Sequence, residues 1–145
     1  MQIGIVNRSN ADKVFIAVRN ISGTALSAGA AVDFDVVTVT DGNSVTASKS
    51  GAIAGLFAGI TDAAMADSAY GLCQVYGYRQ SAYVSAASAG LAPGNFLYAV
   101  GGILTDATMS AAVASGYTKV ALFETIAASA AYSGTRKWNV FIRNM

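Results

Sequence analysis

Turn signals recur at short intervals along the chain, and they limit most uninterrupted segments to the length of a β-strand. Asp41-Gly42 and Gly101-Gly102 are dipeptides typical of two-residue hairpin turns, since these residues accept a positive φ. Pro93-Gly94 fits the two central positions of a type II turn. The segments between such signals are rich in β-branched and aromatic residues and often alternate in polarity. This pattern predicts an all-β fold.

The expected strands number about nine and are short, which is typical of a small β-sandwich or β-barrel. A turn near Arg79-Gln80 is expected to divide one of the longer β-type runs. Asp106 to Gly116 is the best helix candidate, with Asp106 as N-cap, although a loop also fits it. The predicted fold is therefore all-β with at most one short helix. The expected strands are Val14 to Ile21, Ala31 to Thr40, Ser44 to Ser48, Ile53 to Thr61, Tyr70 to Tyr78, Ala82 to Ala86, Phe96 to Val100, Ile103 to Thr105, Lys119 to Ile126 and Trp138 to Arg143.

The length of 145 residues corresponds to one domain, which we expect over residues 13–145. Residues 1–12 alternate poorly and hold too few apolar side chains to form a core, so they are expected to be an N-terminal arm. Its strongest apolar anchors are Ile3, Ile5 and Val6. We expect these three residues to bind another chain by strand addition or in a groove. Pairing within the arm's own domain is the alternative.

Two short internal similarities accompany this pattern. The segment Leu26 to Val32 resembles Leu91 to Leu97, and each is a tight turn that leads into an expected strand. Val14-Phe15-Ile16 recurs as Val140-Phe141-Ile142. Both matches are too short to establish a duplication, and similar turns and similar edge strands also explain them.

Charge is scarce, because Asp, Glu, Lys and Arg make up only 12% of the chain against about 25% in typical domains. A surface so poor in charge favours association with partners, and a monomer coated with small residues is the alternative. The net charge of +1 argues against nucleic-acid binding, which needs a basic surface. No uncharged segment is both long and unbroken enough to span a membrane. The start of the sequence lacks the pattern of a signal peptide, so we expect folding in the cytoplasm.

The residues needed for most catalysis are missing. The chain has no His, so it lacks an imidazole base, and its single Cys, Cys73, lies in an apolar strand where an inert thiol is expected. Asp33 and Asp35 project from one face of an expected strand, opposite Phe34, and a solvent-facing pair explains them better than a cation site. We therefore expect neither catalysis, nor a metal site, nor a cofactor.

Tyrosines suggest a contact surface. Tyr76, Tyr78 and Tyr83 flank the expected turn that carries Arg79 at its tip. Tyr joins a large contact area to a polar end and is enriched at interfaces, so these four residues are predicted to contact a neighbouring subunit. Half-buried tyrosines at strand ends are the alternative.

One further cluster combines basic and aromatic side chains. It consists of Arg136, Lys137 and Trp138. A solvated turn accounts for it, and a docking contact is the second interpretation.

At the level of whole segments the chain resembles the head decoration, or capsid cement, proteins of tailed bacteriophages. The resembling residues are Ala52-Ile53-Ala54-Gly55-Leu56, Tyr70-Gly71-Leu72-Cys73-Gln74-Val75-Tyr76-Gly77-Tyr78, Gly90-Leu91-Ala92-Pro93-Gly94-Asn95-Phe96-Leu97 and Gly101-Gly102-Ile103-Leu104-Thr105-Asp106-Ala107. The family is also similar in length and in its richness in Ala, Gly, Ser and Thr.

This resemblance implies a structural role without catalytic residues. It implies a small β-fold, often a homotrimer, that sits on the capsid exterior of the virion and bridges neighbouring major capsid proteins. Synthesis would take place in the cytoplasm of the bacterial host. Two other classes stay open, namely another virion subunit of the tail or fibre, and a carbohydrate-binding or adhesive β-module. A fibre is expected to show longer repeats, and a sugar binder to place exposed aromatics beside Asp, Asn or Glu.

Overall fold

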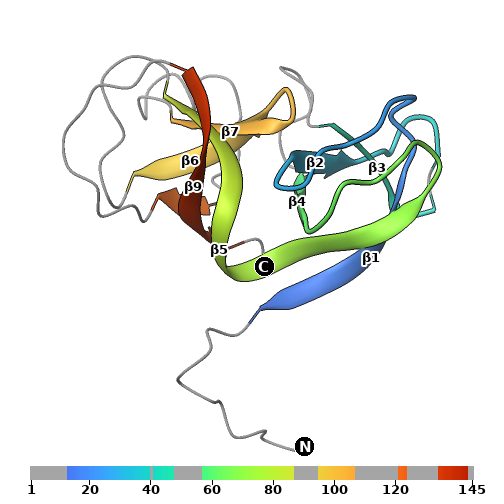
Figure 1. Ribbon diagram of the computed structural model, residues 1–145. Coiled ribbons are helices and arrows are strands. Elements are labelled where there is room, and N and C mark those ends of the chain that lie inside the picture. Colours follow the sequence, from blue (N-terminus) through green and yellow to red (C-terminus); the bar gives the residue numbers. More distant parts are fainter. Residues whose placement is uncertain are drawn as a thin grey trace, which may run out of the picture.

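The computed structural model is all-β, and it describes residues 13–39, 41–47, 57–86, 95–106, 121–123 and 134–143 (Figure 1). No helix occurs in these ranges. The prediction of an all-β fold is confirmed. The described residues form nine strands: β1 (Val14–Asn20), β2 (Ala31–Phe34), β3 (Ser44–Ala47), β4 (Phe57–Thr61), β5 (Tyr70–Ala86), β6 (Phe96–Val100), β7 (Ile103–Asp106), β8 (Ala121–Phe123) and β9 (Gly134–Arg143).

The first five strands close on themselves as a small barrel. β1 pairs in parallel with β3, and the antiparallel pairs β3–β2, β2–β4, β4–β5 and β5–β1 complete the ring. Only the first part of β5, Tyr70 to Tyr76, pairs with β1. The rest of this 17-residue strand is left for other partners.

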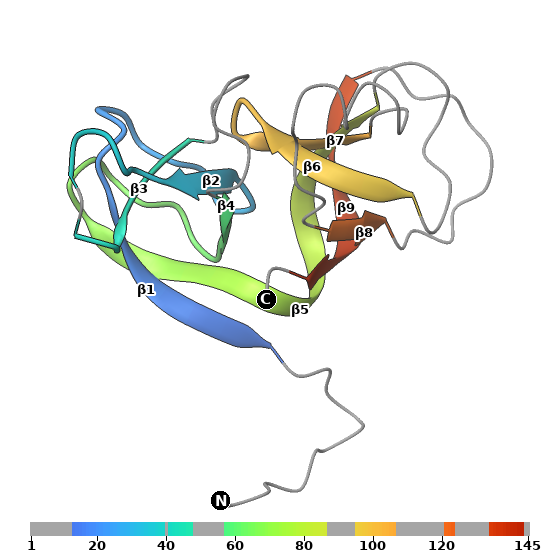
Figure 2. The ribbon, with the colours of Figure 1, turned by 180° about the vertical axis from the view of Figure 1, so that it is seen from behind.

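The second barrel repeats the pairings of the first. β5 pairs in parallel with β7, and the antiparallel pairs β7–β6, β6–β8, β8–β9 and β9–β5 close the ring. Replacing β1 to β5 by β5 to β9, in chain order, reproduces every pairing of the first barrel. β5 is thus the last strand of one barrel and the first strand of the other. It runs beneath the first barrel, bends, and then rises along β9 in the second (Figures 1 and 2).

Of the two internal similarities in the sequence, only one joins strands that are equivalent in the two barrels. Leu26 to Val32 leads into β2, and Leu91 to Leu97 leads into β6, which is the equivalent strand of the second barrel. The match therefore falls at corresponding positions, although residues 91–94 lie outside the described residues. The match of Val14 to Ile16 with Val140 to Ile142 joins β1 to β9, which are not equivalent strands.

Two hydrophobic clusters fill the barrels. The first barrel encloses Val18, Leu26, Val32, Val45, Ala58, Met65 and Cys73. The second cluster combines side chains of the second barrel with others from β2 and β4: Ala31, Phe57, Ile60, Ala82, Val84, Leu97, Leu104, Val140 and Ile142. Because one core includes residues of both barrels, we treat the two barrels as a single packed domain.

One predicted turn is confirmed and another is corrected, while Pro93-Gly94 lies outside the described residues. Asp41-Gly42 does not form a two-residue hairpin, because β2 ends at Phe34 and β3 begins only at Ser44. Gly101 and Gly102, both with positive φ, connect β6 to β7 as a two-residue hairpin. Asp41 precedes Gly42 (φ +78°) ahead of β3, and its Oδ1 accepts hydrogen bonds from the N–H groups of Asn43 and Ser44. Gly59 marks a bulge in β4, and a Cβ there would lie 2.6 Å from the carbonyl oxygen of Gln74.

Several predicted boundaries need correction. The expected strand from Ala31 to Thr40 ends at Phe34, because Asp35 Oδ1 accepts hydrogen bonds from the N–H groups of Val37 and Thr38 and turns the chain. Asp106, the predicted N-cap of a helix, is the last residue of β7, and the residues that it would cap are not among those described. The rest of the helix candidate, residues 107–116, lies outside the described residues.

Candidate interaction surface

The bend of β5, which we call the elbow (Gln74 to Ser81), organises the residues that the sequence singled out. Gly77 has a φ of +97°, a conformation that suits glycine. The register with β9 shifts between Arg79, which pairs with Val140, and Ala82, which pairs with Trp138. One extra residue therefore lies in β5, and such a bulge bends a strand.

Arg79 stabilises the elbow from inside. Its Nη1 donates to Asp62 Oδ1 at 2.6 Å, and its Nη2 donates to the carbonyl oxygens of Thr61 and Asp62 at 3.0 Å each. The Arg79 side chain is only 8% exposed, while that of Asp62 is 48% exposed. The prediction of a turn with Arg79 at its tip is wrong, because β5 is continuous there and the guanidinium finds buried carbonyl acceptors.

Two further contacts fix the elbow. Gln74 is fully buried, and its Nε2 donates to the carbonyl oxygens of Tyr76 and Tyr78, both at 3.1 Å. On the other side, Gly29 of the first barrel accepts a hydrogen bond from the N–H of Tyr83 at 3.0 Å. A Cβ on Gly29 would collide with the carbonyl oxygen of Ser81, so only glycine fits this approach.

The bulge also decides where the tyrosines lie. Tyr78 and Tyr83 are five residues apart and would occupy opposite faces of a regular strand. Because of the extra residue, they pair with Phe141 and Lys137, which share one face of β9. Tyr76, Tyr78 and Tyr83 therefore lie on the same face of the β5–β9 ladder.

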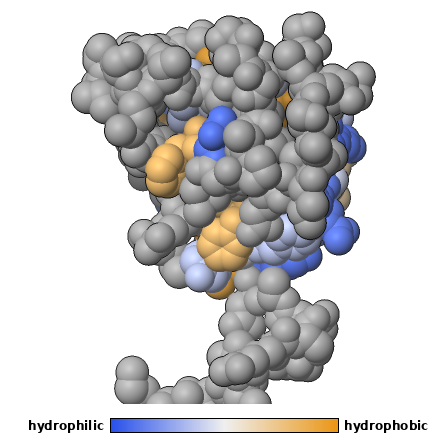
Figure 3. All heavy atoms as spheres, turned by 90° about the vertical axis from the view of Figure 1, so that its left-hand side faces the viewer, coloured by the Kyte–Doolittle hydropathy of each residue, from blue (hydrophilic) through white to orange (hydrophobic). Residues whose placement is uncertain are grey.

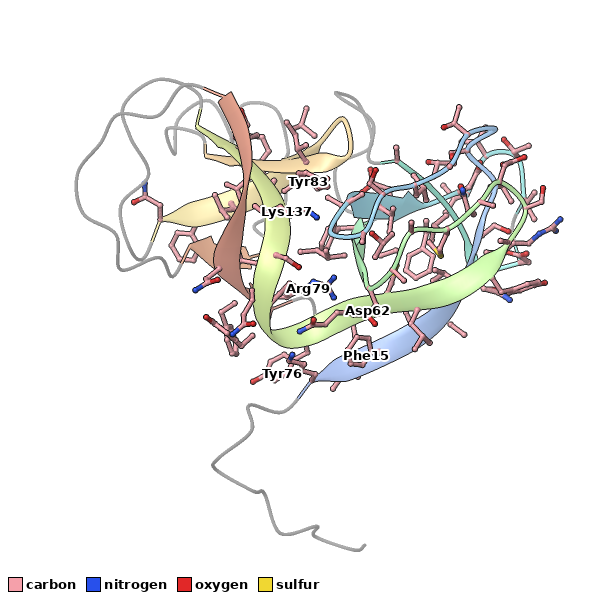
Figure 4. The ribbon with its side chains drawn as sticks, viewed as in Figure 1. Phe15, Asp62, Tyr76, Arg79, Tyr83 and Lys137 are labelled. Atoms are coloured by element: carbon pink, nitrogen blue, oxygen red, sulfur yellow. The ribbon has the colours of Figure 1, made fainter. Side chains whose placement is uncertain are left out.

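The bend separates these residues into two groups. Near the elbow, the ring of Tyr76 packs edge-on against Phe141, with centroids 5.4 Å apart and an interplanar angle of 80°. Further along β5, Lys137 Nζ lies 5.1 Å from the centre of the Tyr83 ring. Figure 4 shows Tyr76 and Tyr83 on different legs of the bent strand. All three tyrosines are half-buried, so the tyrosines alone do not form one open patch.

A more exposed apolar surface lies on the outside of β1 and the first leg of β5. We call it the β1–β5 face, and it consists of Phe15, Ala17, Tyr70 and Leu72. Phe15 is 38% exposed, Leu72 50% and Tyr70 71%. The register pairs Ala17 with Leu72, which places the two side chains on one face. The inward face of the same strands carries Val18 and Cys73, which are buried.

Sequence reasoning missed this surface. Polarity does not distinguish the two faces of β1, because Phe15 and Ala17 are apolar like Val14, Ile16 and Val18. A strand that is apolar on both faces is typical of burial on both sides or of an exposed contact surface. A smaller exposed apolar position occurs at Phe96 on β6. Figure 3, which looks onto the left-hand side of Figure 1, shows hydrophobic side chains at the surface.

The basic and aromatic cluster is part of a strand, not a turn. Arg136, Lys137 and Trp138 lie within β9, which begins earlier than predicted, at Gly134. The Lys137 side chain is exposed and faces Tyr83. The side chains of Arg136 and Trp138 lie outside the described residues, as do all residues of the predicted arm, including Ile3, Ile5 and Val6.

The groups that could have supported chemistry have structural roles. Burial raises the pKa of the Cys73 thiol to about 12, which makes it a poor nucleophile. Asp35 is buried and bonds to the backbone of its own turn. In the part of the chain that the structure describes, no three acidic or Cys side chains come together as a metal-binding group.

Comparison of the sequence with protein-family models and with curated proteins found no match. Among the described residues, no helix has the length and hydrophobicity needed to cross a bilayer. The interpretation of the site therefore rests on the β1–β5 face and its geometry.

Proposed function

We propose that this protein is a structural virion protein that decorates the outside of a tailed-phage capsid and binds the major capsid protein. The observation that supports this best is the β1–β5 face. Both rings of strands close, and each surrounds a cluster of buried side chains, yet Phe15, Tyr70 and Leu72 remain exposed on adjacent strands. Exposed apolar surface of this kind is typical of a protein contact site.

The composition and the resemblance support the same role. A chain with only 12% charged residues has few surface charges to oppose association with other proteins. The longest segment that resembles the decoration proteins, Tyr70 to Tyr78, forms the first leg of β5, which carries half of the β1–β5 face. The resembling segment therefore supplies two residues of the face, Tyr70 and Leu72.

The mechanism of such a protein is mechanical rather than catalytic. A rigid body that binds two neighbouring capsid subunits stabilises the assembled shell, because it binds the assembled state and not the separated subunits. The elbow serves this role by holding the two barrels in a fixed relation, through the Arg79 and Gln74 hydrogen bonds. An apolar face on a rigid support loses little conformational entropy on binding.

The test is binding to isolated shells of the phage whose genome encodes the chain. We expect wild-type protein to co-sediment with undecorated shells and to occur in purified virions in a fixed ratio to the major capsid protein. Leu72→Glu places a charge on the β1–β5 face and is expected to abolish binding. Val37→Glu is the matched control, since Val37 is 73% exposed on a different part of the molecule.

The results of these binding experiments distinguish a capsid decoration protein from a tail or fibre subunit and from an adhesive module. Retained binding by the Leu72→Glu variant would show that the β1–β5 face is not the contact. Absence of the wild-type chain from capsids contradicts the proposal. Its recovery from purified tails instead would indicate another virion subunit, and binding to glycans without binding to shells would indicate an adhesive module.

A further inference from the structure

One edge of β1 is open in the described part of the chain. β5 pairs with β1 from Val14 to Arg19, whereas on the opposite side β3 reaches only Arg19 and Asn20. No described strand pairs with Val14 to Val18 on that side. Figure 2 shows β1 as the outermost of the described strands there. An uncovered edge can add another strand.

The backbone groups on this edge follow from the hydrogen bonds further along β1. The N–H of Asn20 donates toward the β5 side, to the carbonyl of Ala69. The N–H groups of Arg19 and Ile21 donate to the other side, to the carbonyls of Asn43 and Val45, each at 2.9 Å. Directions alternate along a strand, so the N–H and C=O groups of Ala17, Phe15 and Lys13 point to the open edge.

We infer that two copies of this chain pair through this edge, antiparallel, about a two-fold axis at Phe15. In this register Phe15 pairs with Phe15 of the second copy, and Lys13 pairs with Ala17 in both directions. Each such pair exchanges two hydrogen bonds, so all three residues are satisfied in each copy. The two Phe15 rings lie on the same face and form a cross-strand aromatic pair.

Charge selects this register. An axis at Ile16 would place Lys13 opposite Arg19, and it would need the Arg19 N–H, which already bonds to Asn43. The axis at Phe15 places Lys13 opposite Ala17 and ends the ladder before Arg19. The uncharged segment between the two cations therefore matches a second copy of itself, and like charges disfavour the alternative.

The pairing is limited to two copies, because the open edge of β1 in each copy is covered by β1 of the other. It joins the sheets in the order β5-β1-β1-β5 and makes one continuous surface from two β1–β5 faces. The homotrimer that the resemblance implies is a different assembly, and the molecular mass in solution distinguishes a dimer from a trimer. Ten paired residues bury less than the about 1,200 Å² of a standard interface, so the dimer is expected to dissociate on dilution. The inference concerns the isolated chain and does not depend on capsid binding.

Two substitutions at Ala17 test the register. Ala17 is exposed, so both variants are expected to fold, which circular dichroism and thermal melting can verify. In the Ala17→Lys variant the new lysine of each copy lies opposite Lys13 of the other, so the dimer contains two like-charge pairs. Dimerisation should weaken about fivefold. Ala17→Glu faces the same lysine and should strengthen it about fivefold. Sedimentation equilibrium of wild type and both variants measures the constants. Equal constants for the two variants, a trimer mass, or a monomer at about 1 mM would each overturn the inference.

A cross-link gives an independent test. In the proposed register the Cα atoms of the two Phe15 residues are about 5.5 Å apart, which suits a disulfide. Phe15→Cys is therefore expected to give a covalent dimer on mild oxidation. Val37→Cys, at a more exposed position, is the control for random collision. The native Cys73 is buried and does not compete. Cross-linking of Phe15→Cys no faster than that of the control would contradict the pairing.

Discussion

Replacing Arg79 by methionine tests whether this residue stabilises the elbow or contacts a partner. Methionine keeps an apolar stem in the buried space and removes the three hydrogen bonds to Asp62 and Thr61. The substitution is expected to destabilise the domain, because the acceptors lie where β4 ends and water has limited access.

The magnitude follows from the three contacts taken separately. The carboxylate of Asp62 is 48% exposed, so it becomes hydrated and its loss counts as a surface pair, about 0.5 kcal/mol. The carbonyl of Thr61 keeps a second donor, the N–H of Gly29 at 2.9 Å, whereas no other donor is seen for the carbonyl of Asp62 within the described residues. Hydrogen bonds from a charged donor contribute about 1.5 kcal/mol at the lower end of the usual range. The two carbonyl bonds and the surface pair together give a loss of about 3.5 kcal/mol.

Asp62→Asn is the matched variant. It removes the charge of the exposed partner but leaves both backbone carbonyls to Arg79, so the expected loss is below about 1 kcal/mol. Urea unfolding followed by circular dichroism measures both values. The loss in Arg79→Met corresponds to a decrease in Tm of roughly 10 °C for a chain of this size.

Two results would refute this reasoning. Equal losses in the two variants would show that the ion pair, and not the backbone carbonyls, carries the stabilisation. A loss below about 1 kcal/mol in Arg79→Met would show that the elbow does not depend on the guanidinium.

Three further predictions concern single positions. Gly29→Ala should destabilise the domain by several kcal/mol more than Gly23→Ala, since both glycines have similar positive φ values but only Gly29 lies against the carbonyl of Ser81; equal losses in chemical denaturation would contradict this. The thiol of Cys73, with its pKa raised to about 12 by burial, should react with a disulfide reagent at pH 8 only as fast as the protein unfolds, and a fast stoichiometric reaction would show that it is accessible. Backbone hydrogen bonds from Asn43 and Ser44 lower the pKa of the Asp41 carboxyl below its usual 3.8. The stability that this carboxylate contributes is therefore present above pH 3.8 and is lost as the pH falls through its folded-state pKa. Asp41→Asn should lose less stability in acid than wild type does, and identical pH profiles of the two proteins would count against this.

The hairpin turn at Gly101-Gly102 and the alternation of side chains within short strands could be predicted from the sequence. Gly101-Gly102 specifies its turn because both residues adopt positive φ at little cost, and this holds whatever the neighbouring strands are. The opposite orientations of the exposed Leu72 and the buried Cys73 likewise follow from the two-residue period of a strand. From Gln74 to Tyr76 this period is broken, because the register with β1 shifts there. Such features depend on interactions within a few residues, so they can be read locally.

Tertiary structure decided the continuity of β5 and the position of Arg79. The segment around Arg79-Gln80 is polar and flanked by tyrosines, which is typical of a turn, yet the strand passes through it with a bulge. The acceptors that allow Arg79 to be buried lie at the end of β4, Asp62 being 17 residues earlier in the chain. No sequence pattern near Arg79 indicates them.

The exposure of the β1–β5 face was also decided by the fold. Sequence alternation shows that Phe15 and Ala17 share one face and that Ile16 and Val18 share the other, but all four are apolar. Which face is covered depends on where the ring of strands closes, and that depends on pairings between β1 and strands far along the chain. Local chemistry therefore determined the turns and the faces of this protein, whereas the assignment of each face to core or surface required the long-range pairings, because burial is a property of the whole sheet.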